Sequence, residues 1–136
     1  MSSDGDSLSK ISFIHGLMKK EVDELRKILK LEKYHLSETG TPPLDAMIRK
    51  DEVIITAELP GLNINNFTVY IYENLLIIEG VRKIYCTDEK LFFIRAEREF
   101  TPFRRVMQLP FPVENDNTHA VLNNGVLTVT LKKAKK

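Results

Sequence analysis

The chain has 136 residues, 43% of them hydrophobic and 29% charged, and a formal net charge of +1. This length predicts one domain with a sizeable core and leaves room for an appended segment. The near balance of charge argues against nucleic acid as a partner. The single cysteine, Cys86, excludes an intramolecular disulfide, and no apolar run is long enough to span a membrane. The N-terminus lacks the basic and apolar regions of a signal peptide, so we expect a cytoplasmic protein.

The N-terminal segment, residues 1–41, has apolar residues spaced three or four apart. This period predicts an amphipathic helix over residues 9–33, although Gly16 is a plausible point for a break. The apolar stripe either packs on its own domain or on another subunit, or it captures unfolded chains. Both interpretations hold if heating uncovers the stripe. Its candidate client-binding residues are Ile11, Phe13, Ile14, Leu17, Met18, Val22 and Leu25.

After a linker at residues 36–43, the hydrophobic period becomes two. Val53, Ile55, Ala57 and Leu59 share one face of a predicted strand, and residues 67–72 and 76–80 continue the pattern. Short alternating segments separated by turn residues indicate strands of a sandwich. We therefore predict an all-β, immunoglobulin-like β-sandwich preceded by the N-terminal amphipathic helix.

The last predicted strands form a hairpin over residues 120–131. Asn123, Asn124 and Gly125 are residues that tolerate positive φ, which a tight hairpin turn requires. After the turn, residues 126–131 alternate between the apolar and the polar face. Such a hairpin has one apolar face and needs a second sheet to cover it.

Four sequence motifs resemble those of the α-crystallin domain of small heat-shock proteins. Residues 120–129 are similar to A-x-x-x-N-G-V-L-x-V, residues 57–62 to a-x-L-P-G-v, and residues 76–82 to L-x-I-x-G-x-R. Residues 97–110 contain E-R-x, F-x-R and L-P in the same order. The resemblance assigns residues 42–133 to this domain and leaves residues 134–136 as a short tail.

The resemblance implies an ATP-independent holdase that binds partly unfolded client proteins and prevents their aggregation under stress. Two alternatives use the same sandwich: a CS-type co-chaperone, and a structural or coat protein that uses it only for assembly. Partners would be clients and a second copy of the chain, with neither nucleic acid nor membrane. Heat sensitivity of the oligomer size would separate a chaperone from a coat protein.

Two interaction sites follow from the resemblance. Family members bind an I-x-I segment of a neighbour's tail in a groove, which here would be lined by Val69, Ile71, Ala120 and Leu122; core packing is the alternative role of these four. A long loop, residues 82–102, would carry a strand near residues 92–96 that pairs with a partner's sandwich edge. The implied dimer-interface residues are Phe92, Phe93, Arg95, Glu97 and Arg105; the alternative role of Arg95 and Glu97 is that of ordinary solvated charges.

Two further expectations concern assembly. No I-x-I motif follows the last predicted strand. This predicts a dimer or small oligomer with open grooves, which a related subunit that supplies such a tail, or clients, would fill. Cys86 is expected to be a passive thiol in the long loop.

No motif for chemistry is present. The chain has no phosphate-binding glycine loop and no C-x-x-C pair. His15, His35 and His119 are isolated, which argues against a metal site. A serine nucleophile needs a neighbouring base to activate it. The serines of this chain lie in the N-terminal segment or the linker, and no base for them is evident from the sequence. We therefore expect no catalytic residues, no metal and no cofactor.

Overall fold

The computed structural model describes residues 6–7, 11–33, 42–82, 90, 92–98, 100 and 102–135. Nine strands and one helix occur within these residues. In chain order the elements are β1 (Asp6–Ser7), β2 (Ser12–Ile14), α1 (Lys19–Lys33), β3 (Leu44–Arg49), β4 (Glu52–Glu58), β5 (Phe67–Tyr72), β6 (Leu75–Val81), β7 (Pro102–Gln108), β8 (His119–Asn123) and β9 (Val126–Lys132).

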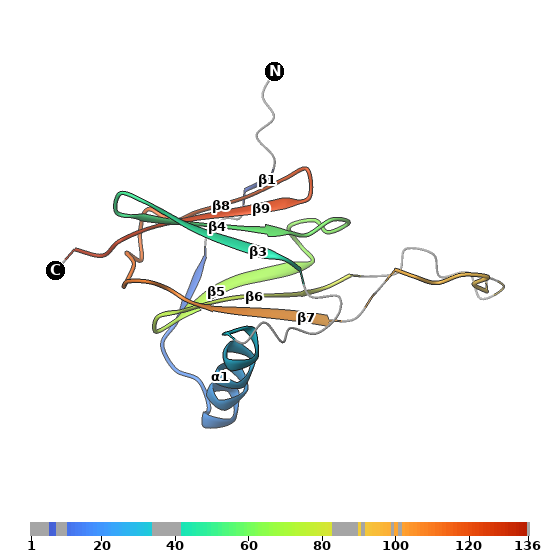
Figure 1. The fold of residues 1–136 in the computed structure, drawn as a ribbon, viewed down its shortest axis with the longest axis horizontal. Helices are drawn as coiled ribbons and strands as arrows, with labels where there is room; N and C mark the ends of the chain where they lie inside the picture. The colour runs from blue at the N-terminus through green and yellow to red at the C-terminus, as the bar shows by residue number, and fades with distance from the viewer. Residues whose placement is uncertain are drawn as a thin grey trace, which may run out of the picture.

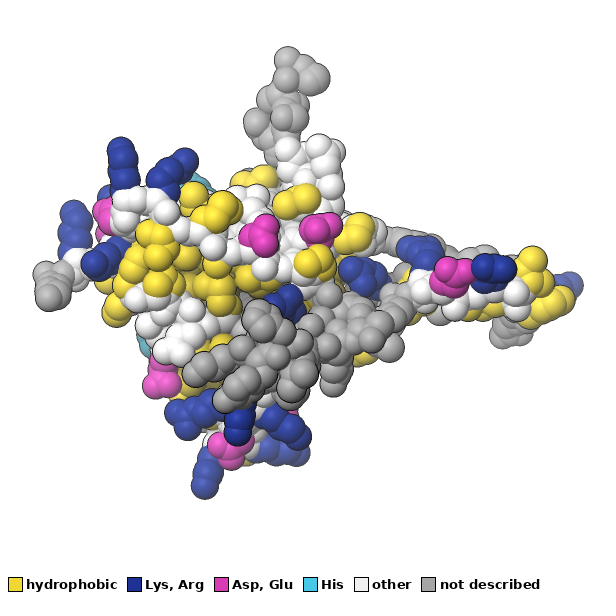
Figure 2. All heavy atoms as spheres, in the orientation of Figure 1, with side chains coloured by type: hydrophobic (Ala, Val, Ile, Leu, Met, Phe, Trp, Pro, Cys, Tyr) yellow, Lys and Arg dark blue, Asp and Glu magenta, His cyan; other side chains and the backbone are white. Residues whose placement is uncertain are grey.

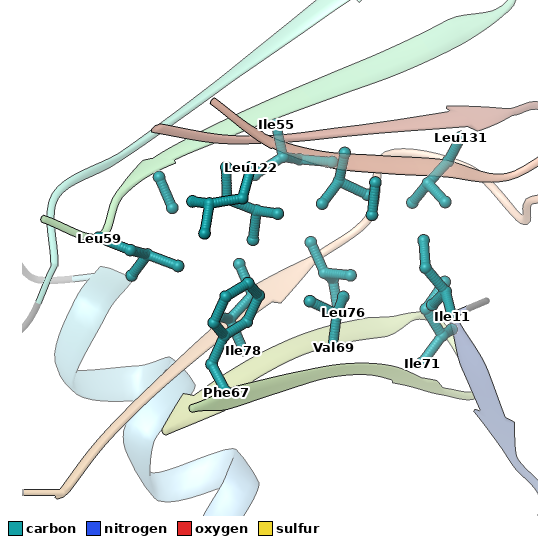
Figure 3. Packing of buried hydrophobic residues seen from close by; sticks show 14 of the residues in the cluster. Ile11, Ile55, Leu59, Phe67, Val69, Ile71, Leu76, Ile78, Leu122 and Leu131 are labelled. Atoms are coloured by element: carbon teal, nitrogen blue, oxygen red, sulfur yellow. The ribbon is translucent and has the colours of Figure 1, made fainter. Parts of the chain in front are cut away.

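Two sheets face each other and enclose the main apolar core (Figure 1). The five-stranded sheet has the order β1-β8-β9-β4-β3, and the four-stranded sheet has the order β2-β5-β6-β7. Aliphatic side chains from both sheets fill the space between them (Figure 3). Helix α1 lies on the other side of the four-stranded sheet, next to β7. The predicted all-β sandwich with one N-terminal helix is confirmed.

The period-two pattern correctly identified the core faces of the strands. Val53, Ile55 and Ala57 of β4 are at most 2% exposed, and they lie directly opposite Leu131, Val129 and Leu127 of β9. Such cross-strand apolar pairs stabilise a sheet and determine its register. The predicted hairpin between β8 and β9 is also present, with positive φ at Asn124 and Gly125.

The predicted start of the helix at residue 9 is wrong. Helix α1 begins at Lys19, and Ser12–Ile14 form a strand that runs parallel to β5. Residues 11–14 contain two isoleucines and a phenylalanine, which favour extended backbone. The edge of β5 supplies the pairing partner, so a tertiary contact overrides the helical spacing.

Strand β6 is apolar on both faces. Leu76 and Ile78 point into the main core, whereas Ile77 packs with Leu25 of α1 and Val106 of β7 in a second apolar cluster. The continuous run from Leu75 to Ile78 is the sequence signal of a strand that is covered on both sides. Helix α1 is therefore a third layer over the sandwich.

Several expectations fall on segments outside the described residues. These include the thiol of Cys86 and the greater part of the linker before Pro42. Of the long loop, residues 92–98 project away from the sandwich (Figure 1). They form no strand within this single chain, so the predicted pairing with a partner stays a prediction.

Candidate functional site

The four predicted groove residues come from two strands that contribute to the same core. Val69 and Ile71 lie on β5, and Ala120 and Leu122 lie on β8. Each is at most 6% exposed and belongs to the main apolar cluster. In this structure they pack as core residues, and their role in binding a partner stays a prediction.

The chain's own N-terminal residues cover the outer edges of both strands. Strand β1 pairs antiparallel with β8, and β2 pairs parallel with β5, with Phe13 opposite Ile71. Ile11 is 3% exposed and belongs to the main core. One of the predicted client-binding residues therefore packs in the same cluster as the predicted groove residues.

The remaining residues of the predicted client-binding set lie in different surroundings. Leu25 of α1 is fully buried in the second apolar cluster, with Ile77 and Val106. Leu17 packs against this second cluster. Phe13, Ile14 and Val22 are half-buried, whereas Met18 is 77% exposed. The prediction of one continuous helical stripe is wrong, because Ile11, Phe13 and Ile14 lie on an extended segment and not on α1. Their role in binding clients is not affected by this correction and stays a prediction.

A charged cluster that sequence reasoning missed joins α1 to the sheet. Arg104 of β7 donates from Nε to Glu79 Oε2 at 2.8 Å, and its Nη1 lies 3.8 Å from Glu24 Oε2 and 3.9 Å from Glu21 Oε2. Partial burial opposes the charge of Arg104, but Glu79 more than offsets it and raises the pKa of Arg104. The side chains of Glu21 and Glu24 are nearly half exposed. Their ion pairs with Arg104 therefore contribute less than about 1 kcal/mol each to stability.

The hydroxyl of Tyr70 belongs to the same cluster and donates to Glu79 Oε2 at 3.3 Å. Burial, and then the negative charge of Glu79, raise the pKa of Tyr70 to about 12. Because this pKa is higher in the folded than in the unfolded chain, the neutral phenol favours folding. That contribution is fully present below pH 10 and is lost as the pH rises towards about 12.

We expect Tyr70→Phe to flatten the loss of stability in this alkaline range. Chemical denaturation of wild type and variant at a series of alkaline pH values measures the difference, since the titration of all other groups is common to both. A spectrophotometric titration should show one fewer phenol with a raised pKa in the variant. An identical alkaline slope in the two proteins would contradict the assignment.

The implied dimer-interface residues of the long loop are exposed and projecting. Phe92 is 80% exposed, Phe93 57% and the adjacent Ile94 96%. Arg95 and Glu97 form an exposed ion pair with each other, 2.9 Å from Nη1 to Oε2. Figure 2 shows hydrophobic and charged side chains together along this projection.

Arg105 is placed differently from the other four residues of this set. It lies on β7, and its guanidinium donates a hydrogen bond to the carbonyl of Pro42, just before β3. Within one chain the structure therefore brings Arg105 to the start of β3, while the loop residues point away from the sandwich (Figure 1).

An apolar edge strand is a second feature that the sequence patterns did not predict. Strand β3 is the last strand of the five-stranded sheet, and five of its six residues are exposed. Met47 is 48% exposed and Ile48 61%. The signal was the short apolar stretch Ala46–Ile48, which begins three residues after the end of the proline-rich linker. An uncovered edge strand of this kind can pair with another chain.

The described part of the chain contains neither a candidate metal site nor a candidate membrane-spanning helix. No group of three or more histidine, cysteine, aspartate or glutamate residues there could hold a metal ion. None of the helices among these residues has both the length and the apolar content needed to cross a membrane.

Comparison with known proteins gives a consistent result. The model of the Hsp20/alpha crystallin family matches residues 45–136. The spore protein SP21 of Stigmatella aurantiaca is 35% identical over 92 residues, which are 68% of this chain and 54% of that protein. The 17.3 kDa class II heat shock protein of Solanum peruvianum is 36% identical over 92 residues, 67% of this chain and 59% of its own length. The chain thus spans little more than half the length of these two relatives.

The fold is similar to that of solved structures. Heat shock protein 16.0 from Schizosaccharomyces pombe superposes with a TM-score of 0.61 at 31% identity, covering 71% of this chain and 89% of that one. A small heat-shock protein from Xylella fastidiosa gives a TM-score of 0.61 at 27% identity, covering 73% of this chain and 92% of that one. Each superposition covers more than two thirds of this chain.

Proposed function

Because this chain belongs to the Hsp20/alpha crystallin family, we propose that it is an ATP-independent holdase that binds partly unfolded proteins. The observation that carries the proposal is the family match, which includes every strand from β4 to β9 and nearly all of β3. Similar proteins that are named heat shock proteins support a role under stress. The physical basis would be competition for apolar surface, since a bound client no longer associates with other unfolded chains.

The capture surface that we propose is the apolar N-terminal segment. Part of it is covered in the structure, because Ile11 and Leu25 are buried. A client would therefore bind after this segment has partly left the sandwich, which heating favours. Met18, at 77% exposure, would be accessible throughout.

The test is to heat an aggregation-prone enzyme with the purified chain in the absence of ATP and to follow light scattering. We expect suppression at near-stoichiometric ratios, whereas an inert protein at the same mass concentration should have no effect. Aggregation that proceeds unchanged at every ratio would overturn the holdase proposal.

We further propose that two copies form a dimer through β3 and the projecting loop. Among the described residues β3 is the edge strand of its sheet and exposes the side chains of Met47 and Ile48, and the loop exposes Phe92, Phe93 and Ile94. In a closed symmetric dimer, the loop of each copy would pair with β3 of the other copy. Both loops and both β3 edges would then be covered. The Xylella fastidiosa relative, described as having a distinct high order structure, supports assembly in general.

Ile48→Asp should weaken this dimer at least about tenfold, since it places a carboxylate in the apolar contact. The control is Lys50→Asp, which introduces the same side chain at an exposed position in the following turn. Sedimentation velocity over a range of concentrations measures the dissociation constant. Equal dimerisation of wild type and Ile48→Asp, or a wild type that is monomeric throughout, would contradict the proposed interface.

A further inference from the structure

The outer face of the four-stranded sheet is the side on which α1 packs (Figure 1). Tyr70 of β5, Ile77 of β6 and Val106 of β7 are neighbours in the two ladders and form an apolar row across this face. The next row carries charge, because Glu79 lies opposite Arg104. The outer face therefore combines an apolar centre with a charged pair at one side.

This face is separate from the predicted groove. Val69 and Ile71 of β5 point into the main core, whereas Tyr70 between them packs against the second cluster with α1. Successive residues of a strand point to opposite faces of a sheet. A ligand on the outer face would therefore contact different side chains from a segment bound in the groove.

Helix α1 complements both parts of the outer face. Leu25 is fully buried against Ile77 and Val106. One turn of helix separates Glu21 from Glu24, and both carboxylates lie within 3.9 Å of Nη1 of Arg104. The residues that fit the face thus form the short pattern E-x-x-E-L at positions 21–25.

Few interactions hold α1 in place. Leu25 is the one fully buried side chain among the described side chains of this helix, and Glu21 and Glu24 are nearly half exposed. A helix of 15 residues is marginal in water, so its helical structure depends on docking. Elements with few buried contacts open at lower free energy than central strands. Detachment of α1 would uncover Ile77 and Val106.

We propose that the outer face is a docking site for an acidic amphipathic helix, and that α1 is its intramolecular occupant. The partner helix places a leucine against Ile77 and Val106, and carboxylates four residues and one residue before this leucine face Arg104. While α1 is docked, the apparent affinity for such a helix is reduced by the small fraction of molecules in which the face is open.

The inference rests on the proposed function in one respect, namely that the partner helix belongs to a client. A partly unfolded client offers amphipathic helices whose apolar sides have lost their own protein core. Such a helix needs an apolar surface of the kind that α1 covers here.

The first test uses the full-length chain and a fluorescein-labelled peptide of residues 17–33. Leu25→Asp should release α1, because a carboxylate is unfavourable against Ile77. Fluorescence anisotropy should give at least about tenfold tighter peptide binding to Leu25→Asp than to wild type, and an intermediate affinity for the milder Leu25→Ala. Arg26→Asp adds the same charge on the exposed side of α1 and should bind like wild type. Equal affinity for wild type and Leu25→Asp would overturn the proposal.

A second test asks whether the peptide binds as a helix. Lys27 is exposed, so its replacement in the peptide removes no apolar contact. The Lys27→Pro peptide should bind Leu25→Asp at least about tenfold more weakly than the normal peptide, because proline breaks the helix. The Lys27→Ala peptide should bind like the normal one. Equal binding of the proline peptide would show that the partner is not a helix and would overturn the proposal.

The role of Arg104 is tested by removal of single charges from the peptide. The Glu24→Gln peptide should bind Leu25→Asp about two- to fivefold more weakly, and less so at high salt, as expected for an exposed ion pair. Asp23 is exposed and makes no ion pair with Arg104 among the described residues, so the Asp23→Asn peptide should bind like the normal one. Equal losses for the two peptides would overturn the preference for the E-x-x-E-L pattern.

Methyl NMR spectra of Leu25→Asp locate the bound peptide. Saturation with the peptide should shift the methyl resonances of Ile77 and leave those of Ile71 unchanged, because these residues point to opposite sides of the sheet. Unchanged resonances of Ile55, which is buried between the sheets, show that the sandwich stays folded. Shifts at Ile71 without shifts at Ile77 would place the peptide in the groove and overturn the proposal.

The light-scattering assay then separates this inference from the proposed function. Leu25→Asp should suppress aggregation at a lower ratio of chaperone to client than wild type, and an excess of the unlabelled peptide should abolish this gain. A gain that persists with the peptide bound would assign capture to the released N-terminal segment and overturn the role of the outer face. Suppression by wild type, together with equal peptide binding by wild type and Leu25→Asp, would overturn this inference while the holdase proposal stands.

Discussion

Replacing Gly80 by alanine is expected to lower the free energy of unfolding by about 2–3 kcal/mol, the upper part of the range for overpacked sites. Gly80 lies opposite Phe67 in the ladder between β5 and β6. A Cβ atom at this position would be 2.6 Å from the carbonyl oxygen of Asn66 and 2.7 Å from Cβ of Phe67. Neither atom can move away by a side-chain rotation, so the backbone of β6 would have to shift. Thermal and urea denaturation measure the loss, with a Tm decrease of roughly 5–10 °C.

Gly16→Ala is the matched control for this substitution. A Cβ atom at Gly16 would have nothing within 4 Å. The change should therefore leave stability unchanged or raise it by about 0.5 kcal/mol, because the unfolded chain loses freedom. Wild-type stability in Gly80→Ala would contradict the packing at this strand end. It would also remove the physical reason for a glycine in the L-x-I-x-G-x-R motif.

Leu25→Asp is expected to detach helix α1 from the sandwich. Leu25 is fully buried against Ile77 and Val106, and removal of a buried leucine alone costs about 2–5 kcal/mol. The new carboxylate adds the cost of a buried charge. The exposed ion pairs of Arg104 with Glu21 and Glu24 are too weak to hold the helix alone. A released helix of 15 residues is marginal in water, so far-UV circular dichroism should lose its helical contribution.

Arg26→Asp is the control, since it places the same side chain on the exposed side of α1. It should retain the helical signal and the wild-type stability to within about 0.5 kcal/mol. If α1 covers a surface that binds clients, Leu25→Asp should also suppress aggregation at a lower ratio of chaperone to client than wild type or Arg26→Asp does. A variant that keeps its helical signal would contradict the docking of α1 through Leu25. A variant that loses the helix and suppresses no better would exclude this covered face as the capture surface.

The alternation of apolar residues was sufficient to predict the sandwich. In β4 and β9 every second side chain is buried between the sheets, because successive residues of a strand point to opposite faces. The turn at Asn124 and Gly125 could also be predicted from the local sequence, since positive φ at two successive positions favours these residue types. The motifs around Gly61, Gly80 and Gly125 identified the family for the same reason: they lie at turns and strand ends where backbone geometry restricts the residue.

The N-terminal segment and the candidate surfaces depended on tertiary contacts. Spacing predicted that Ile11 and Leu25 share one helical face, but Ile11 packs between the sheets and Leu25 packs outside them. Periodicity states which residues need cover and does not state which surface covers them. Residues 12–14 form a strand because they pair with the edge of β5, and α1 packs on the apolar outer face of β6 and β7. The sequence by itself determined the sandwich and its family. The strand edges and the sheet face that the sandwich leaves uncovered decided where β1, β2 and α1 lie.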